Sequence, residues 1–406
     1  MAIPFFSIDI SFKEIISSLK FFKKNKFINS ELLKILSKYF PKKKFLLLPS
    51  ARLGFYLSLK YYFSKGDEII FSALSFPLYV KIAHQQGLKP ILVDVEYDHL
   101  NIDQNKITKN ITKKTKAIVV THLFGHPAKI DEIKQICQKH NIMLIEDCAQ
   151  SFESKYKNQY VGNFGDIAIV SCSLMKTPTT LGGGVLITED NLLIDYMISQ
   201  LKELKTSSIN KLSYNFKGLI SILNSFPLIY SILSHHVFGL LKKRDPNRLR
   251  KILYSGMGML NNKYDWKERP NIQSYQLRFG ISQFQRSKQM NNKRREYANL
   301  LNNGLKNNQK IKLFKEDKNC DWNYQYYVID AGNYFNEIYD KLFDKGIHIM
   351  EENVWDCTKY NIPYLSKDDL NVAKTRNSNL LRIQNNSFLK KKHILSIIDT
   401  INNIDA

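Results

Sequence analysis

The sequence predicts an α/β protein with a large domain built on a mainly parallel sheet and a smaller C-terminal α/β domain. Between residues 45 and 188, short apolar runs alternate with amphipathic segments of helical spacing. Strands that alternate with helices are typical of crossover units, which make the strands parallel and cover both faces of the sheet. The chain of 406 residues also exceeds one ordinary domain, which predicts a second one.

The predicted strands are seven apolar runs, at residues 45–48, 68–71, 91–95, 117–121, 143–146, 167–170 and 185–188. Helices are predicted between them, at 53–63, 79–85 and 130–140. Gly66, Gly87 and Pro90 mark turns. In sheets of this kind the functional site lies beyond the carboxyl ends of the strands. The residues that follow each apolar run are therefore the candidates for chemistry.

Changes in composition divide the chain into four segments. These are a basic helical segment at 1–44, the large α/β domain at 45–204, an apolar helical insertion at 205–270, and a helix with the small domain at 271–406. Within the last segment we expect a helix over 277–301, a strand over 324–329 and a closing helix over 393–403.

The insertion contains a strongly apolar stretch at 218–241, interrupted by Asn224, Pro227, His235 and His236. A membrane-spanning helix needs about 20 predominantly apolar residues, so Pro227 predicts two short helices here instead of one span. With the basic residues at 242–244 and the lysine-rich 1–44, residues 218–244 could contact an anionic membrane surface peripherally. Alternatively, the insertion packs on a dimer partner or covers the site.

The formal net charge of +23 is large enough to raise the question of a polyanionic partner. Most of the positive charge is lysine, and there is no compact arginine stripe, recognition-helix pattern or RNA-binding aromatic signature. The composition therefore favours a solvated basic surface and no nucleic-acid partner.

The five cysteines are widely spread and form no closely spaced pair. This pattern favours reduced thiols in the cytoplasm and argues against a disulfide framework or a metal site. Residues 1–12 lack the basic start, apolar run and cleavage site of a secretory signal.

Two charged residues at strand ends are the strongest candidates for chemistry. Asp147 closes a buried strand, where a carboxylate is costly unless a cation pairs with it. Lys176 follows the next strand and opens a glycine-rich turn at 182–184, and a partly desolvated lysine can act as a nucleophile toward an aldehyde. Pyridoxal phosphate chemistry requires such a lysine and a carboxylate that keeps the pyridine nitrogen protonated. Taken singly, Asp147 could be a capping or salt-bridged carboxylate and Lys176 a surface lysine.

A phosphate cradle is predicted at Ser50, Ala51 and Arg52, between a strand and a helix. The unpaired backbone N–H groups and the dipole at a helix N-terminus favour phosphate. Ser171 adds a hydroxyl on the strand that leads to Lys176.

Residues from about 45 to 190 resemble the DegT-type (DegT/DnrJ/EryC/StrS) sugar aminotransferase family, which are pyridoxal-phosphate enzymes of the aspartate-aminotransferase fold, fold type I. The matching stretches are 65–71, 75–76, 90–95, 101–103, 115–128, 145–150, 165–166, and Lys176 with the glycines that follow it. Residues 276–284 and the helix around 294–297 resemble the family's segment that leads into its small domain.

The resemblance implies cofactor-binding roles for Ser50, Ala51, Arg52, Phe76, Asp147, Gln150, Ser171 and Lys176. Lys176 and Asp147 would be catalytic, Lys176 by binding the cofactor covalently and Asp147 by pairing with the pyridinium nitrogen. Gln150 would lie near the ring hydroxyl and Ser171 would bind phosphate. Phe76 would stack on the ring, although it could instead be a core aromatic after a strand.

The sequence departs from the family at three places and agrees at a fourth. The usual Ser-Gly-Thr cradle is here Ser50-Ala51-Arg52, and Gly182 replaces the acidic residue before the paired glycines. The aromatic-Asn segment that often precedes the region of Gln276 is not found. His122 matches a family position that we interpret as structural.

The resemblance implies a pyridoxal 5'-phosphate-dependent aminotransferase that acts on a nucleotide-linked keto-sugar, with glutamate as the amino donor, in cell-surface polysaccharide or related sugar biosynthesis. It also implies a homodimer. Relatives that deoxygenate sugars lack the lysine, so Lys176 favours amino transfer. The alternative is a catalytically degenerate member that serves as a binding or scaffold subunit at the membrane surface.

Overall fold

The computed structural model of the chain describes residues 2–3, 8–11, 14, 25–204, 220, 222–223, 226–245, 248, 271–351, 355–383, 385–386 and 389–404. Residues 15–20 of the predicted basic helical segment, and much of the predicted insertion, lie outside these residues.

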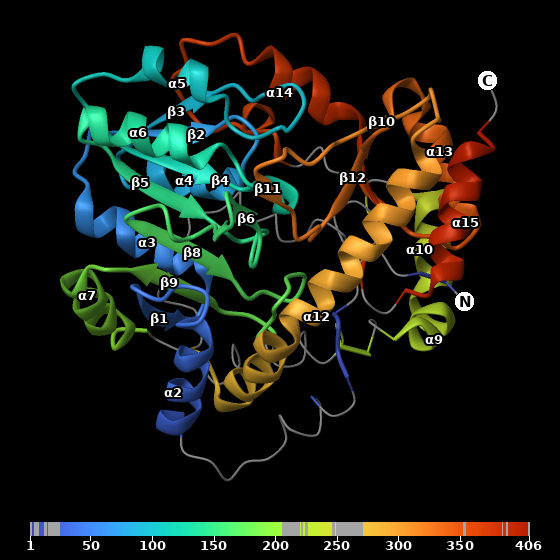
Figure 1. Ribbon diagram of the computed structural model, residues 1–406, viewed down its shortest axis with the longest axis horizontal. Helices are drawn as coiled ribbons and strands as arrows, with labels where there is room; N and C mark the ends of the chain where they lie inside the picture. Colours follow the sequence, from blue (N-terminus) through green and yellow to red (C-terminus); the bar gives the residue numbers. More distant parts are fainter. Residues whose placement is uncertain are drawn as a thin grey trace.

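The central sheet has seven strands, namely β1 (Lys44–Leu48), β2 (Glu68–Ser72), β3 (Lys89–Val93), β4 (Thr115–Thr121), β5 (Met143–Asp147), β8 (Ile167–Ser171) and β9 (Gly184–Thr188). Their order is β1-β9-β8-β5-β4-β2-β3. The strand β9 is antiparallel to both of its neighbours, while the other pairs are parallel. The predicted α/β fold with a mainly parallel sheet is confirmed, and each of the seven predicted strands overlaps an observed one (Figure 1). The strand predicted at 91–95 was placed two residues too late, since β3 spans Lys89–Val93.

Helices cover both faces of this sheet. Consecutive residues of a strand point to opposite faces, so each strand contributes side chains to two separate cores. In β2, Ile69 packs into the core that contains α3 (Ala51–Tyr62) and α4 (Pro77–Gln85). The next residue, Ile70, packs into a separate core with α5 (Gln104–Asn110) and α6 (Ile130–His140). These strands are therefore apolar at most positions away from their ends, as strands buried on both faces are.

The C-terminal part holds a four-stranded antiparallel sheet in the order β10 (Lys312–Leu313), β12 (Tyr327–Asp330), β14 (Leu380–Ile383) and β13 (Met350–Glu351). The helices α13 (Phe335–Asp344) and α15 (Lys391–Asn402) accompany it. The predicted strand over 324–329 was placed too early, since Tyr324 has a left-handed conformation with φ of 49° and β12 begins at Tyr327.

A third sheet connects the two parts of the chain. It pairs β11 (Cys320–Asp321) with β6 (Lys155–Tyr156), which in turn pairs with β7 (Gln159–Tyr160).

The long helix α12 (Ser274–Leu305) runs between the two larger sheets (Figure 1). It packs against α2 (Asn25–Leu36) and against α15. The helix includes the predicted segment 277–301 and extends beyond it at both ends. At its start, Gln273 and Gln276 form a capping box, which explains why it begins before residue 277.

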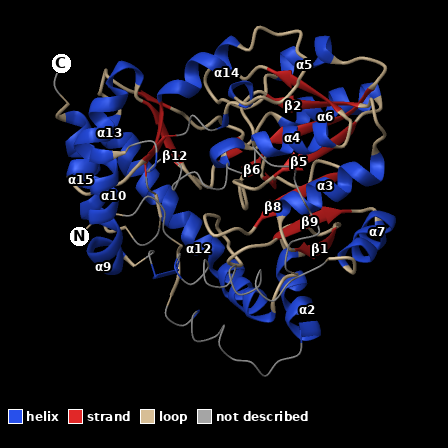
Figure 2. Cartoon of the chain, turned by 180° about the vertical axis from the view of Figure 1, so that it is seen from behind, coloured by secondary structure: helices blue, strands red, loops and turns tan. Residues whose placement is uncertain are grey.

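The longest described stretch of the insertion is helical and consists of α9 (Pro227–Ile229), the π-helical turn η2 (Tyr230–Ser234) and α10 (His235–Arg244). Pro227 therefore begins a helix, as the prediction of two short helices requires, while most of the segment before it lies outside the described residues. Lys242 of α10 forms an ion pair with Asp340 of α13 at 2.6 Å, and both views show these two helices beside α15 (Figures 1 and 2). No helix among the described residues is both long and apolar enough to cross a bilayer.

A close backbone contact joins β9 to the start of α3. A Cβ atom added at Gly184 would lie 2.5 Å from the backbone nitrogen of Ala51. By contrast, a Cβ atom added at Gly239 of α10 would meet nothing within 4 Å. Only a residue without a side chain at position 184 allows this approach.

Replacement of Gly184 by Ala should lower the free energy of unfolding by about 2 kcal/mol, because the added methyl group forces the two backbones apart. Gly239→Ala is the matched control, and it should raise the free energy of unfolding by up to about 1 kcal/mol through helix propensity. Urea denaturation of the cofactor-free protein measures both, and equal stability of the two variants would contradict the role given to Gly184.

Candidate active site

Asp147 lies at the carboxyl end of β5 and is only 4% exposed. Its carboxylate accepts hydrogen bonds from the backbone N–H of Ala149 at 3.1 Å and from the hydroxyl of Thr121 at 3.3 Å. Burial raises the pKa of Asp147 above its ordinary value, although these bonds and the charge of Lys176 act to lower it. The protein thus holds a carboxylate whose charged form is only partly compensated.

The preceding residue, Glu146, points to the other side of β5 and is fully buried. Its two oxygens accept hydrogen bonds from the backbone N–H groups of Gly162, Phe164 and Gly165, at 2.6–2.8 Å, and from His122. Burial acts to raise the pKa of Glu146, but the bond from His122 and those from the backbone hold it below its ordinary value. Two adjacent buried carboxylates are therefore in opposite electrostatic situations.

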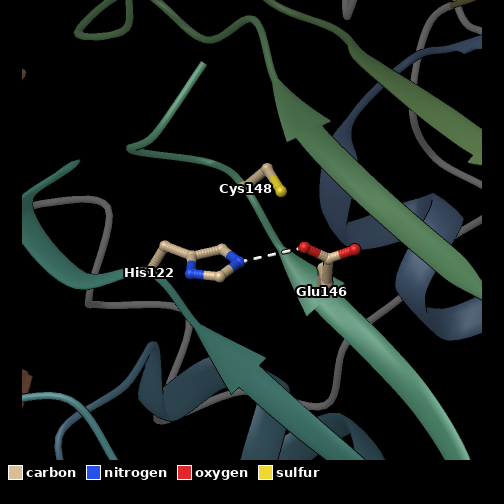
Figure 3. Close-up of side chains that lie close together, drawn as sticks. All are labelled: His122, Glu146 and Cys148. Carbon is tan, nitrogen blue, oxygen red and sulfur yellow. Dashed lines mark hydrogen bonds and ion pairs between the residues drawn. The ribbon is translucent and has the colours of Figure 1, made fainter. Parts of the chain in front are cut away.

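His122 serves this structural network. Its Nδ1 accepts from the backbone N–H of Ala128 at 3.0 Å, so Nε2 carries the proton and donates to Glu146 at 3.1 Å (Figure 3). Cys148 lies close to both, and the polar atoms of the three side chains are within 4.8 Å of one another. Burial raises the pKa of the Cys148 thiol well above its ordinary value. Both nitrogens of His122 and both oxygens of Glu146 already form hydrogen bonds within the protein. The cluster therefore links β4 to β5, in agreement with the structural role that we inferred for His122 from the sequence.

Lys176 lies on the loop after β8, the strand that pairs with β5 beside Asp147. Its Nζ donates a hydrogen bond to the hydroxyl of Tyr326 at 3.1 Å and lies 5.9 Å from the centre of the Trp355 ring. The charge of Lys176 acts to lower the pKa of the Asp147 carboxyl, although burial outweighs it. The structure thus brings the two predicted catalytic residues to the same edge of the sheet.

The predicted phosphate cradle lies at the same edge. Ser50 caps α3, and its hydroxyl accepts a hydrogen bond from the backbone N–H of Leu53 at 3.2 Å. Ala51 and the half-exposed Arg52 form the first turn of this helix. In the sheet, Gly184 is the residue opposite both Leu48 of β1 and Ser171 of β8, so Ser50 and Ser171 approach the edge from either side of β9.

The two remaining predicted residues have definite protein contacts. Phe76 is half-buried at the start of α4, and its ring centre lies 6.0 Å from that of Trp355. Gln150 is 4% exposed, and its side-chain oxygen accepts from the backbone N–H of Phe124 at 2.8 Å. Their roles toward a cofactor remain predictions.

The C-terminal part adds residues that the sequence reasoning missed. A small cavity of about 30 Å³ beside Lys176 is lined in part by Arg294, Gln325 and Tyr326. Arg294 is 3% exposed and donates to the side chains of Thr177 and Asn291 and to the carbonyl of Asn385. Burial lowers the pKa of its guanidinium. No local motif marks Tyr326 or Trp355, so only long-range packing identifies them.

The model of the DegT/DnrJ/EryC1/StrS aminotransferase family matches residues 17–217. GDP-perosamine synthase of Escherichia coli O157:H7 is 42% identical over 132 residues, which are 32% of this chain and 36% of that protein. Lipopolysaccharide biosynthesis protein RfbH of Salmonella typhimurium is 40% identical over 128 residues, which are 32% of this chain and 29% of that protein. The matched segment thus spans about a third of the length of these curated relatives.

The fold is shared more widely than the sequence. The putative sugar aminotransferase Spr1654 from Streptococcus pneumoniae superimposes with a TM-score of 0.73 at 19% sequence identity, over 100% of this chain and 98% of that one. This likeness covers the small C-terminal part as well as the large sheet, and it confirms the predicted fold class.

The opposite situations of Glu146 and Asp147 predict opposite effects of removing their charges. At neutral pH, Glu146→Gln should lower the free energy of unfolding of the cofactor-free protein by about 3 kcal/mol, because it places an NH₂ group against N–H donors. Asp147→Asn should leave that free energy unchanged or raise it, because the carboxylate it removes is incompletely compensated.

The two carboxylates should also affect the pH dependence of stability in opposite directions. The stability that Glu146 contributes is present above its unfolded-state pKa and is lost as pH falls through its lowered folded pKa. The cost of Asp147 instead grows as pH rises from its unfolded-state pKa through its raised folded pKa. Urea denaturation from pH 4 to 7 tests both, and a strongly destabilised Asp147→Asn variant would show this description of the site to be wrong.

Proposed function

The chain belongs to the DegT/DnrJ/EryC1/StrS aminotransferase family, and we propose that it is a pyridoxal 5'-phosphate-dependent aminotransferase of a nucleotide-linked keto-sugar. The observation that carries the proposal is the convergence of Lys176 and the incompletely compensated carboxylate of Asp147 at one edge of the sheet. Similarity to GDP-perosamine synthase and RfbH supports a sugar nucleotide substrate and a role in cell-surface polysaccharide or related sugar biosynthesis.

The residues present fit this cofactor. A buried carboxylate with a raised pKa is stabilised by a cationic partner, which the protonated ring nitrogen would provide to Asp147. The phosphate would lie at the N-terminus of α3, where the helix dipole and the backbone N–H groups of Ala51 and Arg52 favour an anion. The hydroxyls of Ser50 and Ser171 would complete this cradle.

When bound, pyridoxal phosphate supplies an aromatic ring that withdraws electrons from a carbon atom next to the reacting nitrogen. Asp147 would hold the proton on the ring nitrogen, while Gln150 would lie near the ring hydroxyl and Phe76 against the ring face. Lys176 would hold the cofactor through Nζ and, once released by the amino donor, would carry a proton between carbon atoms with the same atom. The bond from Nζ to Tyr326 orients this amine. We propose glutamate as the amino donor.

We propose further that the protein is a cytoplasmic homodimer that contacts a membrane peripherally. All five cysteines are free thiols, and four of them are buried, which supports a reducing compartment. The dimer is proposed because this fold usually builds its site from two subunits.

The first test is the visible absorbance of purified protein after addition of pyridoxal phosphate and removal of the unbound cofactor, which is itself yellow. The wild type and the control Lys202→Ala, which removes an exposed lysine, should turn yellow. Lys176→Ala should not, because it lacks the amine that binds the cofactor covalently. Lys176→Arg should not either, although it keeps a positive charge near Asp147. If substitutions of Lys176 left the spectrum unchanged, Lys176 would not be the residue that binds the cofactor. A colourless wild type would favour the alternative of a catalytically degenerate scaffold subunit.

The second test uses Asp147→Asn. This variant should still turn yellow with the cofactor, because Lys176 is intact. Its spectral change on addition of glutamate should be slower by about 100-fold or more, because the ring nitrogen loses the group that keeps it protonated. Stopped-flow absorbance measures this rate, and a wild-type rate would remove Asp147 from the mechanism. A screen of nucleotide keto-sugars then identifies the acceptor.

A further inference from the structure

Large exposed aliphatic side chains gather on one described element, the helical stretch from α9 to α10. The α9–α10 outer face is defined by Leu228, Ile232, Val237 and Leu240, which are 58%, 63%, 52% and 56% exposed. Elsewhere among the described residues, large hydrophobic side chains exposed by half or more stand singly, as Tyr97, Leu192, Leu365 and Leu395 do. Single exposed leucines are ordinary, whereas a contiguous apolar surface marks an interaction site.

Helical spacing places Leu228, Ile232 and Leu240 on one side, in a row at multiples of four residues that also contains the exposed His236 between the last two. Two residues of the opposite side are held by the small domain. Tyr230 is 2% exposed, and its hydroxyl is hydrogen-bonded to Nδ1 of His348 at 2.5 Å. His235 is hydrogen-bonded to Nε2 of the same histidine at 3.1 Å. The helix therefore keeps its orientation, and the outer face stays turned away from the small domain.

The charges on this helix have a single sign. The sequence from Pro227 to Arg244 contains no Asp or Glu. At its end, Lys243 and Arg244 are exposed, whereas Lys242 is held by Asp340. An exposed apolar stripe with a cationic end is the pattern of helices that lie in the interface of an anionic bilayer.

We propose that the α9–α10 outer face docks on an anionic lipid surface. The four aliphatic side chains enter the boundary between headgroups and acyl chains, and Lys243 and Arg244 contact the anionic headgroups. The helix lies in the plane of the surface, as interfacial helices do. A second copy of the chain fits less well, because an isologous contact of this helix with itself would offer the two cations no carboxylate from the helix. The proposal is independent of the catalytic assignment.

The test is co-sedimentation of the full chain with vesicles of phosphatidylcholine alone or of phosphatidylcholine with phosphatidylglycerol. The wild type should bind the anionic vesicles at least about tenfold better than the neutral ones. The double variant Ile232→Glu with Leu240→Glu should lose about tenfold or more of this binding. The matched control, Leu192→Glu with Leu395→Glu, makes the same change at two leucines that are 69% and 50% exposed elsewhere, and it should bind as the wild type does.

A charge variant, Lys243→Gln with Arg244→Gln, should lose the preference for anionic vesicles. Equal binding of the wild type to both vesicle types, or equal loss in the control, would overturn the proposal. Sedimentation velocity without lipid tests the alternative that a second copy of the chain covers this face. If the change at 232 and 240 converts a dimer into monomers and the wild type ignores vesicles, the face is a contact between two copies. The cofactor spectrum should be unchanged in all these variants, so failure here is distinguishable from failure of the proposed function.

Discussion

The site depends on the burial of two adjacent carboxylates at the end of β5. A buried negative charge is costly unless donors or a cation compensate for it. Glu146 is compensated by four hydrogen bonds, three of them from the backbone between 162 and 165, and it thereby fixes the turn that leads into β8. Asp147 has two hydrogen bonds and a raised pKa. Glu146 thus stabilises the turn between β5 and β8, while Asp147 remains able to pair with a cation at the edge of the sheet.

The remaining parts of the site are arranged around that edge by the parallel strands. Because β1, β5 and β8 run in the same direction, the residues that follow each of them meet beyond the same ends. The antiparallel β9 lies between β1 and β8, and its first residue, Gly184, lets the chain approach the start of α3. A phosphate cradle and a nucleophilic lysine can therefore be placed on either side of β9.

The C-terminal part completes the surroundings of Lys176. Tyr326 accepts a hydrogen bond from Lys176. The centre of the Trp355 ring is 5.9 Å from Nζ of Lys176 and 6.0 Å from the centre of the Phe76 ring. The insertion is tied to the same small domain through the contacts of Tyr230 and His235 with His348. The exposed aliphatic face of the insertion therefore belongs to a helix whose other side is hydrogen-bonded to the small domain.

From the amino-acid sequence we could predict the alternation of strands and helices, the strand ends at Asp147 and Ser171, and the order of residues that indicates the cofactor. These features are local, because periodicity and turn residues act over a few positions. Three features became visible only in the folded chain: the donors that compensate Glu146, the contacts of Tyr326 and Trp355 with Lys176, and the exposed face of the helix from Pro227 to Arg244. Each of these depends on contacts between residues far apart in the chain, such as the 150 positions between Lys176 and Tyr326, and no local pattern encodes which distant segments will pack together.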